Sequence, residues 1–324
     1  MAGKHIKELI AAYRDRDDLA FRRAANAIID EEESKRHTAL ARDLRQLLAG
    51  SRQSVPVALD VLPDAPRDRD SGQALADVAA PRLAGLGDLV FDPELRARLM
   101  ALVEEVRVWP AFDAAGVPRR NRVLLFGPPG NGKSSIAEAM AAELGWPLVR
   151  ARIDSLVSSY LGETAGNLRS LFDFARTTAS VVLLDEFDSL GKLRDDPSDH
   201  GELRRVVNTV LQLIDRYQGK GFIVAATNTP EVLDAALWRR FDEVVEVPGP
   251  DAALARALLA RLLPRHDADA AIARAAQHLD GLPYAAVEHA AHGALRRALL
   301  DGRCRVSAED LMCSVDETTT RPWR

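Results

Sequence analysis

The sequence predicts an α/β fold, a parallel sheet with helices on both faces, and three observations support that fold class. Short, almost entirely apolar runs are typical of strands buried on both faces, and they occur at 122–127, 147–153, 180–186, 222–228 and 243–247. Helical patterns separate these runs, and this alternation favours parallel strands joined by helices. The strand pattern stops after Pro250, and residues 251–313 have the periodicity of several helices.

The rest of the chain differs in character from this α/β region. The first 50 residues show helical periodicity and no strand signal, so we expect a small helical bundle that docks a substrate or a partner. Proline, serine, aspartate and glycine then become frequent, which indicates a linker. The expected organisation is a bundle at 1–50, a linker at 51–82, an α/β domain at 83–249, and a small helical domain with a tail at 250–324.

Composition excludes several classes of protein. The chain has 324 residues, a net charge of −5 and 47% hydrophobic residues, which is ordinary for a globular protein and gives no basic footprint for nucleic acid. Cys304 and Cys313 are the only cysteines, so reduced thiols are expected. We find neither a signal-peptide core at the N-terminus nor a run of about 18 apolar residues, and we therefore expect a cytoplasmic protein without a membrane span.

A phosphate-binding loop stands between a strand and a helix. "GPPGNGKS" at 127–134 fits the pattern G-x-x-x-x-G-K-[ST], in which backbone N–H groups and a helix N-terminus face the phosphates. Lys133 is expected to reach the β- and γ-phosphates, and the Ser134 hydroxyl to bind Mg²⁺. The residues expected to bind ATP here are Gly127, Pro128, Pro129, Gly130, Asn131, Gly132, Lys133, Ser134 and Ser135.

Two other strands end in polar residues suited to hydrolysis. Asp185 closes "VVLLDE" and is expected to reach Mg²⁺ through coordinated water, so that it completes the ATP site with Ser134. Glu186 is the expected general base that polarises the attacking water. Asn228 ends "FIVAATN" and is placed to orient water near the γ-phosphate.

These motifs stand in an order that resembles the AAA+ ATPases. "NRVLLFGPPGNGKSS", "VVLLDEFDSLG", "VVNTVLQLID" and "FIVAATNTPEVLDAALWRRFDEVVEV" follow one another as in the single-ring protein remodellers, a group that includes katanin-like and AAA-protease ATPases. The resemblance covers roughly 83–315. It implies a P-loop NTPase domain with a five-stranded parallel sheet, a C-terminal helical lid, ATP and Mg²⁺ as cofactors, and a homo-oligomeric ring of about six subunits.

The resemblance also assigns roles to two adjacent arginines. The family places arginine before Phe-Asp to reach the ATP of a neighbouring subunit, where its charge stabilises the transition state. Family members commonly separate two arginines by a pair of residues, whereas Arg239 and Arg240 are adjacent. Arg240 directly precedes Phe-Asp and is ranked first as the arginine finger, with Arg239 as the alternative.

A tyrosine, a leucine and a glycine occupy the position of the family's first pore loop. Tyr160, Leu161 and Gly162 follow the second predicted strand, and in a ring their copies would contact a polypeptide in the central channel. Packing of Tyr160 into a local core is the alternative. The charged stretch 192–205 falls where a second pore loop would lie, and a plain solvated loop explains it nearly as well.

The leading functional hypothesis is an ATP-driven, ring-forming protein unfoldase or remodeller. The chain has no protease motif, so any degradation would come from a separate protease, and a protease or another effector is the expected kind of partner. A DNA-associated loader and a nucleotide-gated scaffold are the alternatives. Two departures from the family concern adenine recognition: Phe91 and Tyr284 stand where the family carries small residues. Either adenine is packed differently or the lid opens at a different angle.

Overall fold

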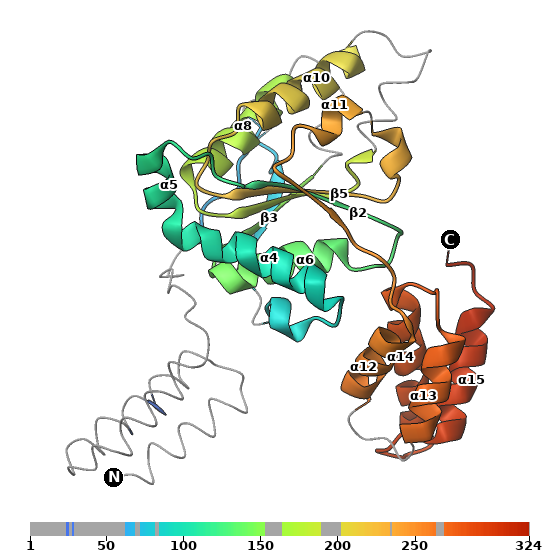
Figure 1. The fold of residues 1–324 in the computed structure, drawn as a ribbon. Coiled ribbons are helices and arrows are strands. Elements are labelled where there is room, and N and C mark those ends of the chain that lie inside the picture. The colour runs from blue at the N-terminus through green and yellow to red at the C-terminus, as the bar shows by residue number, and fades with distance from the viewer. Residues whose placement is uncertain are drawn as a thin grey trace. The chain divides into compact units, whose positions relative to one another are not determined.

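The computed structural model describes residues 24–25, 28, 62–68, 72–81, 84–152, 164–188, 202–233, 235–263 and 269–323. The chain divides into two compact units, Met1–Val55 and Pro56–Arg324. In the first unit the described residues Ala24, Ala25 and Ile28 are helical, and the rest of the expected N-terminal bundle lies outside the described residues. The second unit contains the labelled strands and helices (Figure 1).

A six-stranded, mostly parallel sheet forms the centre of the α/β region, in the order β1-β3-β4-β5-β2-β6. The strands are β1 (Ala76–Ala79), β2 (Arg122–Phe126), β3 (Leu148–Ala151), β4 (Val181–Leu184), β5 (Phe222–Thr227) and β6 (Glu243–Glu246). Strands β2 to β6 are parallel and coincide with the apolar runs that predicted them. The predicted parallel sheet is therefore confirmed, and β1 extends it by one strand.

Strand β1 comes from the segment expected to be a linker, and it pairs antiparallel with β3 from Ala76↔Ala151 to Ala79↔Leu148. The segment before it is also fixed: the Asn167 amide donates to the Asp68 carboxylate at 2.6 Å, and both side chains are buried. Leu75 is fully buried in the core. Part of the predicted linker is thus an integral edge of the sheet.

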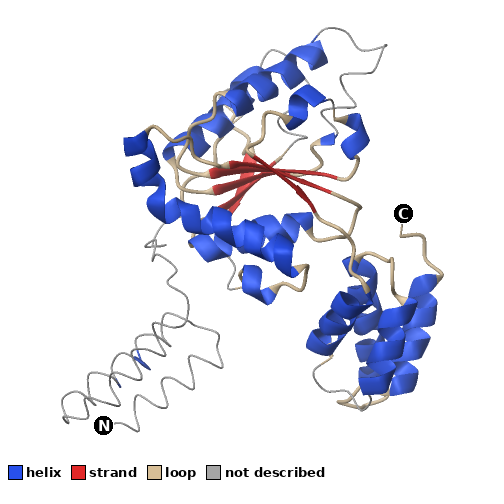
Figure 2. Cartoon of the chain, viewed as in Figure 1, coloured by secondary structure: helices blue, strands red, loops and turns tan. Residues whose placement is uncertain are grey.

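Helices cover both faces of the sheet (Figure 2). On one face lie η1 (Leu86–Asp88), α4 (Pro93–Glu105), η2 (Val106–Val108), α5 (Trp109–Ala115) and α6 (Lys133–Leu144), and on the other α8 (Thr164–Thr177), α10 (Glu202–Asp215) and α11 (Ala235–Trp238), with η3 (Pro230–Val232) after β5. The alternation of side chains along a strand explains the two layers. Val123 and Leu125 pack in the core with α4 and α6, whereas Leu124 between them packs with α8 and α10.

A bundle of helices follows β6 (Figure 1). Its members are α12 (Ala252–Leu262), α13 (Asp269–His278), α14 (Tyr284–Leu300) and α15 (Ala308–Thr319). Side chains start two of them: Asp251 accepts from the Leu254 N–H at 2.7 Å, and Ser307 forms a capping box with Asp310. Across the described residues, no helix combines the length and the apolar character that a membrane crossing requires.

Candidate nucleotide site

The loop after β2 has a backbone that only glycines can follow. Gly127 has a φ of 142°, and a Cβ there would lie 2.4 Å from the Val247 carbonyl oxygen of the neighbouring chain segment. Gly130 and Gly132 also have positive φ values, of 75° and 81°. Helix α6 begins at Lys133, so its free N–H groups lie at the end of this loop, where they favour an anion such as a phosphate.

Lys133 is buried within the loop that it belongs to. Its ammonium group donates to the carbonyl oxygens of Gly127 at 2.7 Å and Pro128 at 2.8 Å. Burial lowers the pKa of Lys133, while Asp185 and Asp188 act in the opposite direction by favouring the charged form. The chain thus holds a cation at the place where a bound nucleotide would bring negative charge.

The strand end predicted to complete the site does meet the phosphate loop. The Ser134 hydroxyl donates to Asp185 Oδ2 at 2.6 Å, which joins the start of α6 to the end of β4. A hydroxyl and a carboxylate are hard oxygen ligands of the kind that Mg²⁺ prefers. Among the described residues no cluster of three or more His, Cys, Asp or Glu could hold a metal, so any ion here would need further ligands from the nucleotide or water.

Glu186 has an unusual backbone conformation next to Asp185. Its φ is 51°, the one positive value among the described residues other than glycine. Its N–H donates to Asp185 Oδ1 at 3.0 Å, and the next residue is anchored because the Phe187 N–H donates to the Ala226 carbonyl at 2.9 Å. The carboxylate of Glu186 is exposed. Strained backbone that neighbouring hydrogen bonds hold in place is frequent at functional sites.

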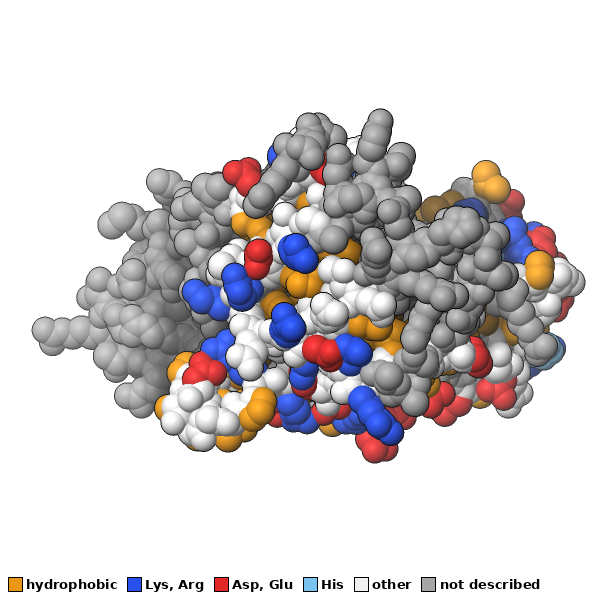
Figure 3. All heavy atoms as spheres, turned by 90° about the horizontal axis from the view of Figure 1, so that it is seen from above, with side chains coloured by type: hydrophobic (Ala, Val, Ile, Leu, Met, Phe, Trp, Pro, Cys, Tyr) orange, Lys and Arg blue, Asp and Glu red, His pale blue; other side chains and the backbone are white. Residues whose placement is uncertain are grey.

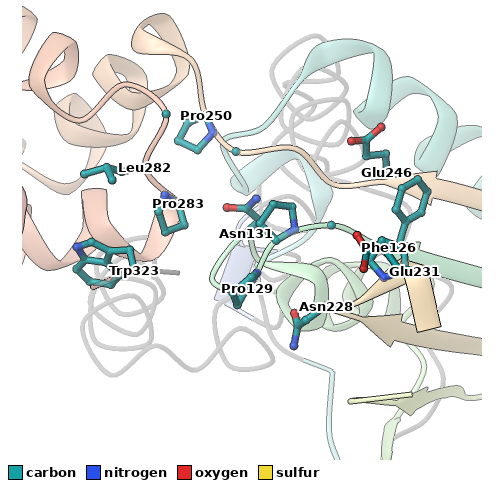
Figure 4. A pocket seen from close by; sticks show the side chains of 15 residues that line it. Phe126, Pro129, Asn131, Asn228, Glu231, Glu246, Pro250, Leu282, Pro283 and Trp323 are labelled. Atoms are coloured by element: carbon teal, nitrogen blue, oxygen red, sulfur yellow. The ribbon is translucent and has the colours of Figure 1, made fainter. Parts of the chain in front are cut away.

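A cavity of about 740 Å³ lies between the phosphate loop and the helical bundle (Figure 4). Asn228 lines it on the sheet side, together with Gly127 and Pro128. The lining residues are Phe126, Gly127, Pro128, Pro129, Asn131, Asn228, Pro230, Glu231, Glu246, Gly249, Pro250, Gly281, Leu282, Pro283 and Trp323. The structure therefore brings Asn228 to the same opening as the phosphate loop.

The bundle touches the phosphate loop directly, a contact that the sequence analysis missed. The Ala285 N–H at the start of α14 donates to the Gly130 carbonyl at 3.0 Å. A Cβ on Gly130 would lie 3.0 Å from the Ala285 Cβ and 3.3 Å from the Pro283 Cβ, so the glycine permits this approach. Trp323 was also missed, because only the folded tail brings it to the cavity. No local pattern marks it.

The two candidate arginines have different surroundings. Arg240 donates to the Leu211 carbonyl at 3.1 Å and forms an ion pair with Asp215, both near the end of α10. Arg239 is exposed, and its side chain forms no hydrogen bond or ion pair with the part of the chain that the structure describes. Tyr160, Leu161 and Gly162 lie outside the described residues, between β3 and α8.

Comparisons with known proteins show the family of the chain. The family model described as "ATPase family associated with various cellular activities (AAA)" matches residues 123–249. The AAA family ATPase y4kL of Sinorhizobium fredii is 41% identical over 98% of this chain and 96% of its own length. The chain belongs to the AAA family of ATPases. As a member of this family, it binds and hydrolyses ATP.

Two longer relatives match this AAA ATPase over only part of their own length. The ATP-dependent zinc metalloprotease FtsH 3 of Sphaerobacter thermophilus is 33% identical over 86% of this chain, and the match spans 58% of FtsH 3. A proteasome-activating nucleotidase of Methanoculleus marisnigri is 34% identical over 62% of the chain and 50% of its own length. In fold, the chain is similar to the crystal structure of the FIGL-1 AAA domain, with a TM-score of 0.62, 25% identity, and coverage of 76% of this chain and 86% of that one.

Proposed function

We propose that this AAA ATPase assembles into a homo-oligomeric ring of about six copies and uses ATP hydrolysis to remodel polypeptides. The observation that carries the proposal is the exposure of Arg239 beside the anchored Arg240. A guanidinium held at a surface without a partner among the described residues of its own chain is suited to complete the active site of a neighbouring copy. Such a residue can raise turnover by orders of magnitude.

Magnesium fits the residues at the start of α6. The Ser134 hydroxyl and the Asp185 carboxylate already face each other at 2.6 Å, and both are oxygen donors. Bound there, Mg²⁺ would neutralise phosphate charge during hydrolysis. In this proposal Lys133 binds the phosphates, and Ser134 and Asp185 hold the ion.

Glu186 and Asn228 supply the hydrolytic groups in this proposal. Glu186 has an exposed carboxylate directly after Asp185, so it can accept a proton from an attacking water. Asn228 lines the cavity at the phosphate loop and can orient that water. Their side chains belong to the ends of neighbouring parallel strands, β4 and β5, where ligands bind in α/β sheets.

The choice of a polypeptide substrate rests on the Tyr160-Leu161-Gly162 segment and on the relatives. FtsH 3 is named as an ATP-dependent metalloprotease and another relative as a proteasome-activating nucleotidase. The net charge of −5 favours protein over nucleic acid. On the face shown in Figure 3, basic side chains have acidic ones beside them. We further propose that the N-terminal unit Met1–Val55 docks the substrate or a separate effector such as a protease.

The first test is the mass in solution of the Glu186→Gln variant, with and without ATP and Mg²⁺. This variant should retain ATP because the phosphate loop is intact, so the nucleotide-bound state accumulates. A shift to a ring-sized particle with ATP supports the proposal. A particle that stays monomeric in both conditions rejects the ring, and with it the pore and the trans-acting arginine.

The second test separates the pore from the ring. Tyr160→Ala should lose unfolding of a tagged model protein, whereas Tyr160→Phe, which keeps the aromatic ring, should retain it. If Tyr160→Ala unfolded the model protein as fast as the unmodified protein does, Tyr160 would not be a substrate-contacting residue.

A further inference from the structure

The segment directly before β1 folds back on itself as a hairpin. The Leu75 N–H donates to the Pro66 carbonyl at 2.8 Å, and the Asp68 N–H donates to the Gln73 carbonyl at 2.8 Å. An isolated β-bridge lies between these two hydrogen bonds. We call this hairpin together with β1, which are the described residues of 66–79, the strap.

The strap is held to the α/β domain by its apolar side chains. Leu75 is fully buried, and Ala76 is 1% exposed. Both belong to the core layer that contains Leu168 and Leu171 of α8. Because detachment would expose this apolar surface to water, the strap stays packed against α8.

A buried polar contact gives the strap a second and more specific attachment. The Asn167 amide donates to the Asp68 carboxylate at 2.6 Å, and the two residues are 4% and 6% exposed. Asn167 lies in the first turn of α8, where the helix dipole favours a negative charge. A buried carboxylate is costly unless its hydrogen bonds are made, so this contact specifies one position of the strap on α8.

The strap makes contact on both sides of the segment that carries Tyr160. Before that segment, the Arg152 N–H directly after β3 donates to the Leu75 carbonyl at 3.0 Å. After it, Asn167 donates to the strap as described above. The strap thus holds the chain at both ends of the stretch that contains Tyr160, and in the sequence it also follows the N-terminal unit Met1–Val55.

The strap is also joined to the hydrolytic carboxylates through the sheet. Strand β1 pairs with β3, and β3 pairs with β4. Asp185 and Glu186 follow β4 directly. Backbone hydrogen bonds therefore connect the strap, the strand before Tyr160 and the strand before the carboxylates.

We propose that the strap couples the N-terminal unit to the segment that carries Tyr160, and that Asp68 and Asn167 are the positioning residues of this coupling. A polypeptide held by the N-terminal unit would pull on the strap, and the strap transmits that pull to the ends of β3 and α8. The inference rests on the proposed remodelling of polypeptides. Neither positioning residue lines the cavity beside the phosphate loop, so ATP turnover without a polypeptide does not depend on them.

The test separates coupling from folding by exchanging the two partners. Asn167→Asp brings two carboxylates together, whereas Asp68→Asn/Asn167→Asp exchanges donor and acceptor and restores the hydrogen bond. Each full-length protein is assayed for ATP turnover with and without casein, and for unfolding of a tagged model protein. Asn167→Asp should keep its turnover without casein, and its stimulation by casein and its unfolding rate should fall by about 2- to 30-fold. The double variant should recover both.

Asn121→Ala is the matched control. Asn121 is also a buried asparagine, and its amide donates to the Gly219 and Gly221 carbonyls at 3.1 and 3.2 Å, away from the strap. This variant should melt at a lower temperature and keep its response to casein.

Two results would overturn the inference and leave the remodelling function standing. One is normal stimulation and unfolding in Asn167→Asp. The other is a parallel loss of melting temperature and of turnover without casein in that variant, which would make the contact structural only. An unmodified protein that responds to neither casein nor the model protein would reject the remodelling function and the coupling with it.

Discussion

The Ser134 hydroxyl lies 2.6 Å from Asp185 Oδ2, and this contact joins two segments that are far apart in the sequence. Ser134 begins α6 after the phosphate loop, and Asp185 follows β4. The parallel sheet is what brings them together, because the carboxyl ends of its strands share one edge.

Removing either partner of this contact should weaken the Mg²⁺ dependence of nucleotide binding. Ser134→Ala loses the hydroxyl and Asp185→Asn loses the negative charge, so each should bind ATP nearly equally with Mg²⁺ and with EDTA. The unmodified protein should bind more tightly with Mg²⁺. Titration of a fluorescent ATP derivative measures the difference, and Ser170→Ala, at a partly exposed serine on α8, is the control. A Mg²⁺ effect of normal size in both variants would contradict the assignment.

Turnover should depend on Glu186 far more than binding does. Loss of a general base typically lowers a rate by about 10²- to 10⁴-fold, so Glu186→Gln should bind ATP and release phosphate at a small fraction of the normal rate. Phosphate release and ATP affinity are measured on the same sample. Glu104→Gln, on the exposed side of α4, should have normal turnover. A Glu186→Gln protein with normal turnover would show that another group is the base.

The structure favours Arg239 over Arg240 as the arginine finger. Because Arg240 is held by Asp215 and the Leu211 carbonyl, Arg240→Ala should lower the free energy of unfolding, by about 1 kcal/mol or less for so exposed an ion pair. Arg239→Ala should keep its melting temperature and lose ATP turnover. Thermal melts and phosphate release distinguish the two roles.

A mixing experiment decides whether Arg239 acts on a neighbouring copy. Arg239→Ala and Glu186→Gln should each be inactive alone. In a mixed ring, a Glu186→Gln subunit supplies Arg239 to a neighbour whose Glu186 is intact, so activity should return. Mixtures no more active than the sum of the two variants would mean that Arg239 acts within its own chain or not at all.

The sheet and the phosphate site were predictable because each depends on a local pattern. Continuous apolar runs marked β2 to β6, and the glycines and Lys133 stand together in one short segment. Strand β1 was not predictable in this way. Ala76–Ala79 is short and lies among linker-like residues, and its strand conformation comes from pairing with β3.

The parts of the site that the sequence did not indicate arise from tertiary contacts. The hydrogen bond from Ala285 to Gly130, the position of Trp323 at the large cavity, and the anchoring of Arg240 by Asp215 each join distant segments. None has a periodicity or a motif of its own. The unusual identity of Tyr284 was visible in the sequence, but its burial at the start of α14 required the fold.

Acid should destabilise the helical bundle through Asp310. Two hydrogen bonds from the Arg303 guanidinium, at 2.6 and 2.8 Å, hold the pKa of the Asp310 carboxyl far below its usual value, and the Ser307 N–H and hydroxyl lower it further. Burial acts in the opposite direction and is outweighed. Since the folded pKa is depressed, the carboxylate stabilises the protein above its unfolded pKa, and this stabilisation is lost as the pH falls through the folded value.

Thermal melts across pH test this linkage. The melting temperature of the unmodified protein should fall below about pH 4, where the unfolded chain begins to bind the proton. Asp310→Asn should melt at a lower temperature at neutral pH, because the ion pair with Arg303 is lost, and its melting temperature should change less in acid. Asp316→Asn, at an exposed position of the same helix, is the control and should follow the unmodified curve. If Asp310→Asn lost stability in acid as steeply as the unmodified protein, the acid sensitivity would belong to other carboxylates.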